Sequence, residues 1–187
     1  MKWVTREKIR VNRTATCWLV RRFIDPTAVF IFVSPDNVSS IQAEQSAIGF
    51  DAPNATYPHK NENGLCSFAA LVHERFSENV VLMEMARIVQ AADFKDQLDD
   101  HPAARGLQLI SHGFPIVTKD DHETARRAAF VYDSLYASIE VALRAVTQFR
   151  DESNGSLWIR GWILCGIGII VRSLRISNGG SHAETQC

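Results

Sequence analysis

One short segment near the N-terminus combines a cysteine with two arginines. Thr14 can cap a helix with its hydroxyl, which would place Cys17 in the first helical turn. Unpaired N–H groups and the helix dipole favour negative charge there, so the pKa of the thiol would fall towards the reactive thiolate form. Arg21 and Arg22 follow one turn later, and guanidinium groups suit a tetrahedral oxyanion. Pro26 then ends the helix, because proline cannot continue it. The segment predicts a reactive thiol beside an anion site.

The same pattern is also typical of an ordinary buried helix. In that interpretation Cys17 packs as a small apolar side chain, because free cysteine is among the most buried residue types. Arg21 and Arg22 would then form a solvent-exposed pair on the helix surface. The residues alone leave both interpretations open.

The composition is that of an ordinary globular protein. Of 187 residues, 46% are hydrophobic and 22% charged, which suffices for one domain with a core. The formal net charge of -1 gives no overall electrostatic basis for nucleic acid, so we expect no direct nucleic-acid binding. The four cysteines (17, 66, 165 and 187) form no Cys-x-x-Cys pair, and no apolar run follows the basic N-terminal residues. We therefore expect reduced cysteines and a cytoplasmic protein.

The hydrophobic pattern changes from strands to helices along the chain. The predicted strands are 3–5, 28–34 and 48–51; a short helix lies within 35–47; 52–65 is a loop; helices follow at 67–76, 80–93, 102–113 and from after Thr118 to about 150. Thr118 to Asp121 resembles a capping box for the last helix. This pattern predicts an α+β, mainly helical fold, in which a small N-terminal strand element packs on a helical body.

The last part of the chain differs in kind, so we predict a domain over 1–150 and an apolar C-terminal tail over 151–187 with a disordered end. Within the tail, 157–171 is apolar but is interrupted by Arg160 and three glycines. Its uninterrupted part is too short for a membrane helix, which needs about 20 residues. Because exposed apolar patches of this size are rare on soluble monomers, we expect the tail to pack on the body or on a second copy, in a homodimer.

Several blocks of residues resemble a known family when taken in order. They are 13–25 (RTATCWLVRRFID), 50–51 followed by His59, 66–68 (CSF), 88–93 (IVQAAD), 120–122 (DDH) and 131–137 (VYDSLYA). Together they cover about residues 2–138 and resemble the chromate-resistance family that includes the C-terminal domain of the chromate sensor ChrB. Any one block is weakly specific, whereas their common order is specific.

The resemblance implies that residues from separate blocks meet in one site. It suggests that Cys17 comes together with four side chains that we expect to form a metal site: His59, Cys66, Asp93 and His122. Thiolate, imidazole and carboxylate are the usual ligands of transition metals, although no local metal-binding spacing occurs here. The ordinary alternative is that these residues are surface histidines and core cysteines.

The resemblance further implies a bacterial chromate-resistance protein. We expect it to sense or handle chromate, a similar oxyanion, or a metal ion derived from chromate, through an arginine, thiolate and histidine site that includes Arg21 and Arg22. One alternative is a metalloenzyme of redox or sulfur chemistry with a His/Asp/Cys metal site. Another is a non-catalytic regulatory domain whose DNA-binding part lies on another chain.

Overall fold

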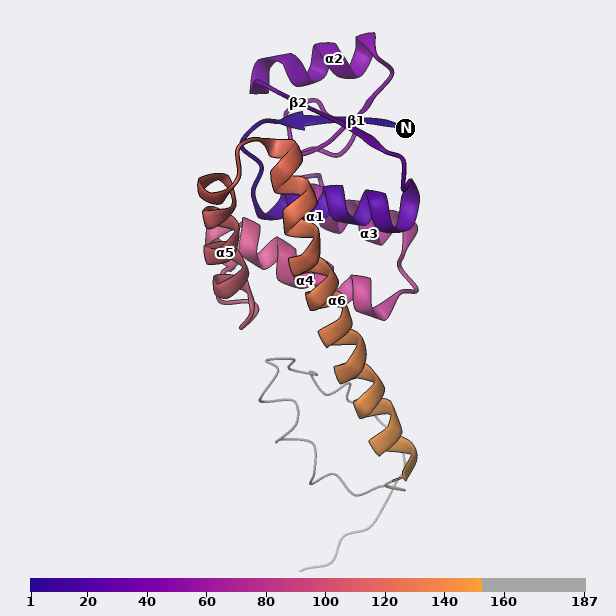
Figure 1. Ribbon diagram of the computed structural model, residues 1–187. Coiled ribbons are helices and arrows are strands. Elements are labelled where there is room, and N and C mark those ends of the chain that lie inside the picture. Colours follow the sequence, from indigo (N-terminus) through magenta and orange to yellow (C-terminus); the bar gives the residue numbers. More distant parts are fainter. Residues whose placement is uncertain (153–187) are drawn as a thin grey trace, which may run out of the picture.

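The computed structural model describes residues 1–152 and has a small sheet at one end of a larger helical body (Figure 1). In chain order the elements are β1 (Lys2–Arg6), α1 (Val11–Leu19), the π-helical turn η1 (Val20–Ile24), β2 (Val29–Val33), η2 (Pro35–Asn37), α2 (Val38–Glu44), β3 (Ile48–Gly49), α3 (Ser67–Arg75), α4 (Val80–Asp93), η3 (Lys95–Gln97), α5 (Ala104–Val117) and α6 (Asp121–Glu152). The predicted α+β, mainly helical fold is confirmed.

The sheet is parallel, with β1 between β2 and β3. Parallel neighbours need crossover connections, which α1 and α2 supply on opposite faces of the sheet (Figure 1). Because side chains alternate along a strand, Trp3 points to the helical body, and Val4 packs with Val38 under α2. The sheet thereby brings the end of β3 next to the start of α1.

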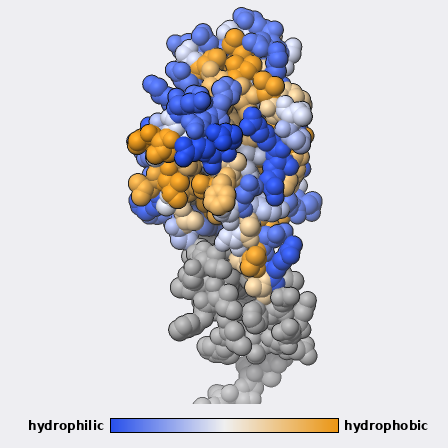
Figure 2. Space-filling view, viewed as in Figure 1, coloured by the Kyte–Doolittle hydropathy of each residue, from blue (hydrophilic) through white to orange (hydrophobic). Residues whose placement is uncertain are grey.

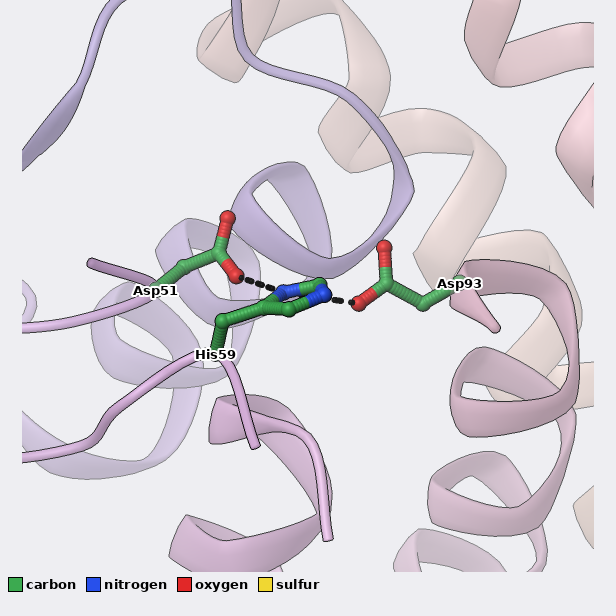
Figure 3. Close-up of side chains that lie close together, drawn as sticks. All are labelled: Asp51, His59 and Asp93. Carbon is green, nitrogen blue, oxygen red and sulfur yellow. Dashed lines mark hydrogen bonds and ion pairs between the residues drawn. The ribbon is translucent and has the colours of Figure 1, made fainter. Parts of the chain in front are cut away.

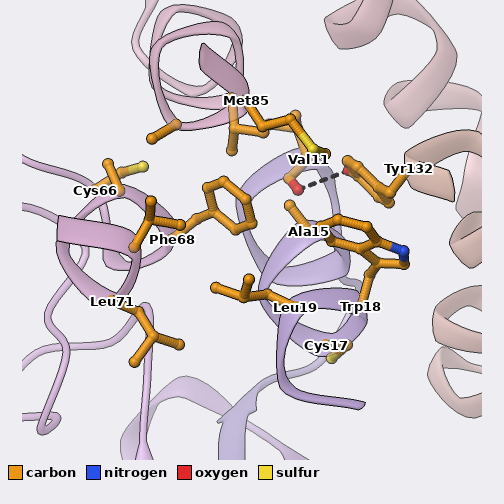
Figure 4. Close-up of a cluster of buried hydrophobic side chains, with 14 of the residues drawn as sticks. Val11, Ala15, Cys17, Trp18, Leu19, Cys66, Phe68, Leu71, Met85 and Tyr132 are labelled. Atoms are coloured by element: carbon orange, nitrogen blue, oxygen red, sulfur yellow. Dashed lines mark hydrogen bonds between the residues drawn. The ribbon is translucent and has the colours of Figure 1, made fainter. Parts of the chain in front are cut away.

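The core of the body forms around α1, which packs against α3, α4 and α6. Figure 4 shows apolar side chains from these helices meeting there, including Leu19, Phe68 and Met85, all fully buried. The hydroxyl of Tyr132, on α6, donates a hydrogen bond of 2.8 Å to the carbonyl oxygen of Val11. This bond joins the first turn of α1 to the longest helix.

The start of α1 corrects one expectation, because the helix begins at Val11 and Thr14 does not cap it. The hydroxyl of Thr14 instead donates to the carbonyl oxygen of Arg10 at 2.9 Å, within the helix. The carboxylate of Asp121 accepts hydrogen bonds from the N–H groups of Lys8 and Ile9, which fixes the chain just before the helix. A contact from a helix more than 100 residues away therefore lets α1 start three residues before Thr14.

The cap of α6 also differs from the predicted capping box. The carboxylate of Asp120 accepts from the N–H of Glu123 at 2.7 Å, and Glu123 accepts from the N–H of Lys119 at 2.9 Å. This arrangement resembles a capping box that starts two residues later, at Asp120, except that Glu123 accepts from the N–H of Lys119 and not from that of Asp120. The Thr118 hydroxyl bonds the carbonyl oxygen of Phe114 instead. The helix then runs to Glu152.

Two predictions concern the end of the chain. Residues 153–187, and with them most of the predicted tail, lie outside the described residues, so the division at residue 150 stays a prediction. Within 1–152, no helix is both long enough and apolar enough to cross a membrane.

Candidate functional site

Asp51 is the centre of the candidate site and lies just after β3. Its backbone has φ of 53°, in the left-handed region that non-glycine residues rarely adopt. The Asp51 N–H donates to the carbonyl oxygen of Tyr57 at 2.8 Å, and the Arg6 guanidinium donates to the Asp51 carbonyl oxygen at 2.7 Å. These two bonds hold Asp51 in its strained backbone conformation and direct its carboxylate into the helical body.

Four side chains contact the buried carboxylate of Asp51. Asn12 Nδ2 and His59 Nδ1 lie 2.9 Å and 2.7 Å from Oδ1, and Arg6 and Arg13 lie 2.8 Å and 3.1 Å from Oδ2. Burial would raise the pKa of Asp51, but the His59 hydrogen bond and the two guanidinium charges outweigh burial and hold it below its usual value. Asp51 is therefore a stably ionised carboxylate at the centre of the site.

Asn12 ties this carboxylate to α3. Its Oδ1 accepts from the backbone N–H of Phe68 at 3.0 Å and lies 3.1 Å from the hydroxyl of Ser67. Because only an oxygen can accept from a backbone N–H, the other end of the amide, Nδ2, must face Asp51. The first turns of α1 and α3 thus fix the orientation of Asp51.

Asp93 approaches the same histidine from the other side, as the last residue of α4 (Figure 3). Its Oδ2 lies 3.6 Å from His59 Nδ1, is buried, and has no hydrogen-bond partner among the described residues. Burial first, and then the charge of Asp51, raise the pKa of Asp93 to about 7. The Asp93 carboxyl can therefore exchange its proton near neutral pH.

His59 lies between the two carboxylates and is also open to solvent. The hydrogen bond to Asp51 raises its pKa, and its side chain is 48% exposed. Asp51, His59 and Asp93 each offer a ligand atom, and these atoms all lie within 4.8 Å of one another. Oxygen and nitrogen ligands about 2.0–2.2 Å from one ion lie about 3–4 Å apart, so small side-chain shifts suffice to bind one. The three residues can hold a proton or a metal cation.

The structure places the other predicted ligands differently. Cys66 lies directly before α3 and is fully buried. Burial raises the pKa of its thiol most, and the charge of nearby Asp93 raises it further. His122 is exposed and packs edge-on against the ring of Phe32, with 4.9 Å between the ring centroids. Neither residue belongs to the group of ligand atoms found within 1–152.

Cys17 and the two arginines lie apart from this group. Cys17 is in the second turn of α1 and 1% exposed, and burial raises the pKa of its thiol despite the charges of Arg21 and Arg13. The first-turn placement was wrong because the helix starts earlier. Arg21 stacks on the ring of Phe30 at 4.9 Å, and Arg22 pairs with Asp133 at 3.3 Å. Their predicted roles as reactive thiol and anion ligands stay predictions.

Sequence reasoning missed Asp51 and its partners Arg6, Asn12 and Arg13 as site residues. Phe50-Asp51 was one of the blocks that carry the resemblance, which was the available signal. The others lie on β1 and α1, and only the parallel sheet brings those elements to the end of β3.

Comparisons with known proteins agree with the resemblance. The model of the ChrB C-terminal domain family matches residues 3–139, which include the whole Asp51–His59–Asp93 cluster. Protein ChrB of Cupriavidus metallidurans is 29% identical over 138 residues, which are 72% of this chain and 40% of that protein. The chain thus spans well under two thirds of the curated relative's length, and no solved structure matches it. The chain belongs to the family of the ChrB C-terminal domain.

Proposed function

We propose that this chain is a chromate-resistance protein that binds a transition-metal cation at Asp51, His59 and Asp93. One observation carries the proposal: the buried Oδ2 of Asp93 has no hydrogen-bond partner within the described part of the chain and faces His59 Nδ1. A buried carboxylate oxygen without a donor costs free energy, and a bound cation removes that cost.

The donor set matches this class of ligand. Imidazole nitrogen together with carboxylate oxygens suits first-row transition metals, and the exposed His59 leaves room for water or an oxyanion on the ion. The ion would take the place of the proton between His59 Nδ1 and the carboxylates. Asp51 would also serve as the fixed negative charge, since Arg6, Arg13 and Asn12 hold it in place.

The link to chromate comes from family membership. The cation is then one of two kinds: a resident ion that contacts chromate, or a metal ion that is itself derived from chromate. In both cases the site senses or handles the chromate or the ion derived from it. The metalloenzyme alternative requires an open coordination position on a stoichiometric ion. The regulatory alternative requires that ion binding changes how this domain contacts another part of the protein or another chain.

Metal titration of the full chain tests the proposal. The chain is stripped with a chelator and titrated with Mn²⁺, Co²⁺, Zn²⁺ and Cr³⁺, with binding followed by calorimetry and by the visible absorption of Co²⁺. We expect one ion per chain and loss of binding in His59→Gln, with Co²⁺ absorption typical of mixed nitrogen and oxygen ligands. His112→Gln, which changes another exposed histidine, is the control variant. A parallel series measures the thermal stability of the chain with chromate, and sulfate is the control anion.

The outcomes separate the interpretations. A chain that binds no cation but is stabilised by chromate more than by sulfate would overturn the cation site and favour oxyanion capture by Arg21 and Arg22. Binding that persists unchanged in His59→Gln would place the ion elsewhere and would also overturn the proposal.

A further inference from the structure

The outer side of α5 carries a row of exposed apolar side chains, with Arg105 and His112 along its edge. Four exposed side chains lie on it: Leu109 (74% exposed), Ile110 (50%), Ile116 (81%) and Val117 (62%). The opposite face of the helix, with Leu107 and Phe114, is already buried against the body. A helix that is apolar on both faces is expected to be covered on both. Figure 2 shows the apolar surface on this side of the molecule, over α5.

Two glycines extend the same face. Gly106 and Gly113 follow the spacing of Leu109 and Ile116, and a Cβ added at either glycine would meet nothing within 4 Å. Glycine inside a helix costs about 1 kcal/mol relative to alanine, and nothing in the described structure requires its small size here. Small residues on a helix face let a second segment approach closely.

The face continues onto α6. Arg127 donates a hydrogen bond of 2.8 Å to the carbonyl oxygen of Val117, which joins the C-terminal end of α5 to α6. Phe130 follows three residues later on the same side of α6 and is 77% exposed. We call Gly106, Leu109, Gly113, Ile116 and Phe130, with their apolar neighbours on α5, the α5 face. Exposed apolar side chains that gather on one face are typical of docking sites.

We propose that residues 157–171 of the same chain dock on the α5 face. This segment carries Trp158, Trp162 and a run of isoleucine, leucine and glycine with a single charge, Arg160, so its side chains match the exposed apolar side chains of α5. Its own glycines again suit close contact between two backbones. Because the segment is tethered, its effective concentration at the α5 face is in the millimolar range, well above that of a second copy of the chain.

The chain length allows this docking. From Phe130 to Glu152, α6 is roughly 33 Å long at 1.5 Å per residue. Thirteen residues lead from Glu152 to Cys165, in the middle of the segment, and an extended chain of that length spans at most about 45 Å. Cys165 can therefore return alongside α6 to the level of α5.

Cysteine cross-linking in the full chain tests the proposal. Cys187→Ser leaves Cys165 as the one thiol in 153–187, while Cys17 and Cys66 are buried. New thiols are placed on the α5 face by Leu109→Cys or Ile116→Cys, and Glu44→Cys on α2 is the exposed control. After mild oxidation, we expect an intramolecular disulfide to Cys165 that forms at least about tenfold faster from the α5 face than from the control, since a disulfide requires Cα atoms within about 7 Å.

Three results would overturn the proposal. Disulfides that join two chains would assign the α5 face to a second copy. Equal rates at all three positions would show no docking. In the third result, the unoxidised chain binds to anionic phospholipid vesicles, and Cys165 is protected from labelling only in the bound fraction. This result would assign the segment to a membrane surface.

A second measurement covers the case in which a cysteine variant fails to fold. Trp3 and Trp18 are 0% and 3% exposed, so changes in tryptophan emission report on Trp158 and Trp162. In the full chain, Ile116→Glu is expected to shift the emission to the red and to increase quenching by acrylamide. Val80→Glu, at another exposed apolar position (65%), is the matched control. Identical emission in both variants would contradict docking on the α5 face.

Discussion

The Oδ2 atom of Asp93 lies 3.6 Å from Nδ1 of His59, while the same nitrogen lies 2.7 Å from Oδ1 of Asp51. Asp51 is ionised and held by two guanidinium groups, and Asp93 has a pKa raised to about 7. One histidine is thus shared by a fixed negative charge and by a carboxyl group that gains or loses a proton near neutral pH. A cation bound here, as proposed, would compete with protons for this position.

We predict that Asp93→Asn weakens metal binding on the order of 100-fold or more, because the amide cannot replace a negatively charged ligand. Calorimetric titration with Zn²⁺ or Mn²⁺ measures the change. Asp96→Asn, three residues later and exposed, removes the same charge outside the cluster and should leave affinity unchanged. Equal affinities of the two variants would exclude Asp93 as a ligand.

The metal-free chain should lose stability as the pH rises towards and past 7. The folded state raises the pKa of Asp93 to about 7 and also raises that of His59, so it binds protons more tightly than the unfolded state does. The stability from Asp93 is fully present below its unfolded pKa, near 4, and is lost as the pH rises through about 7. Thermal unfolding in a chelator between pH 5 and 8.5 measures this loss. In Asp93→Asn the loss should be smaller, and a slope equal to that of the unchanged chain would contradict the assignment.

Metal ions should stabilise the chain more as the pH rises over the same range. Binding requires the ionised Asp93 and an imidazole nitrogen without its proton, so protons compete with the metal. The difference in unfolding temperature with and without Zn²⁺ should grow between pH 6 and 8. A difference that stays constant would show that Asp93 and His59 do not exchange a proton for the ion.

Asn12→Ala should destabilise the fold and disturb the site together. The change leaves the N–H of Phe68 and a lone pair of Asp51 without their partner, at about 1–3 kcal/mol for each buried group left unpaired. Denaturant unfolding gives the stability, and titration of the folded chain gives metal affinity. Ser40→Ala removes an exposed hydrogen bond to Asn37 and should change neither value. A stable Asn12→Ala chain with unchanged affinity would refute the positioning role.

The thiols distinguish the two interpretations of the first helix. Cys17 and Cys66 are buried, and burial raises the pKa of both thiols, so both should react with iodoacetamide only as the chain unfolds. Mass spectrometry of labelled peptides between pH 6 and 9 separates the cysteines. Labelling of Cys17 that is faster than that of Cys187 near neutral pH would instead support the reactive thiolate predicted from the sequence.

The double variant Arg21→Gln, Arg22→Gln tests the oxyanion prediction. If these residues hold chromate, the variant should lose chromate-dependent stabilisation while its metal affinity stays the same, because both side chains lie apart from the Asp51 cluster. Thermal unfolding with chromate and with sulfate measures the effect. Chromate stabilisation that survives in the double variant, but is lost in Asp93→Asn, would place the oxyanion on the metal site.

The sequence alone determined the elements and their kind. The strands, the helix at 80–93 and the long last helix all appear in the structure, since hydrophobic periodicity acts within a few residues. It also indicated His59 and Asp93 as members of one site, through the order of the family's blocks. Both are local or family-level signals that a single chain carries.

Only the tertiary structure decided where α1 begins and which groups meet at His59. Asp121, far along the chain, fixes the residues before α1 and thereby moves Cys17 out of the first turn. The parallel sheet brings Arg6 beside Asp51 at the end of β3. These outcomes depend on contacts between residues far apart in sequence, whose hydrogen bonds and charges leave no periodic trace in the chain.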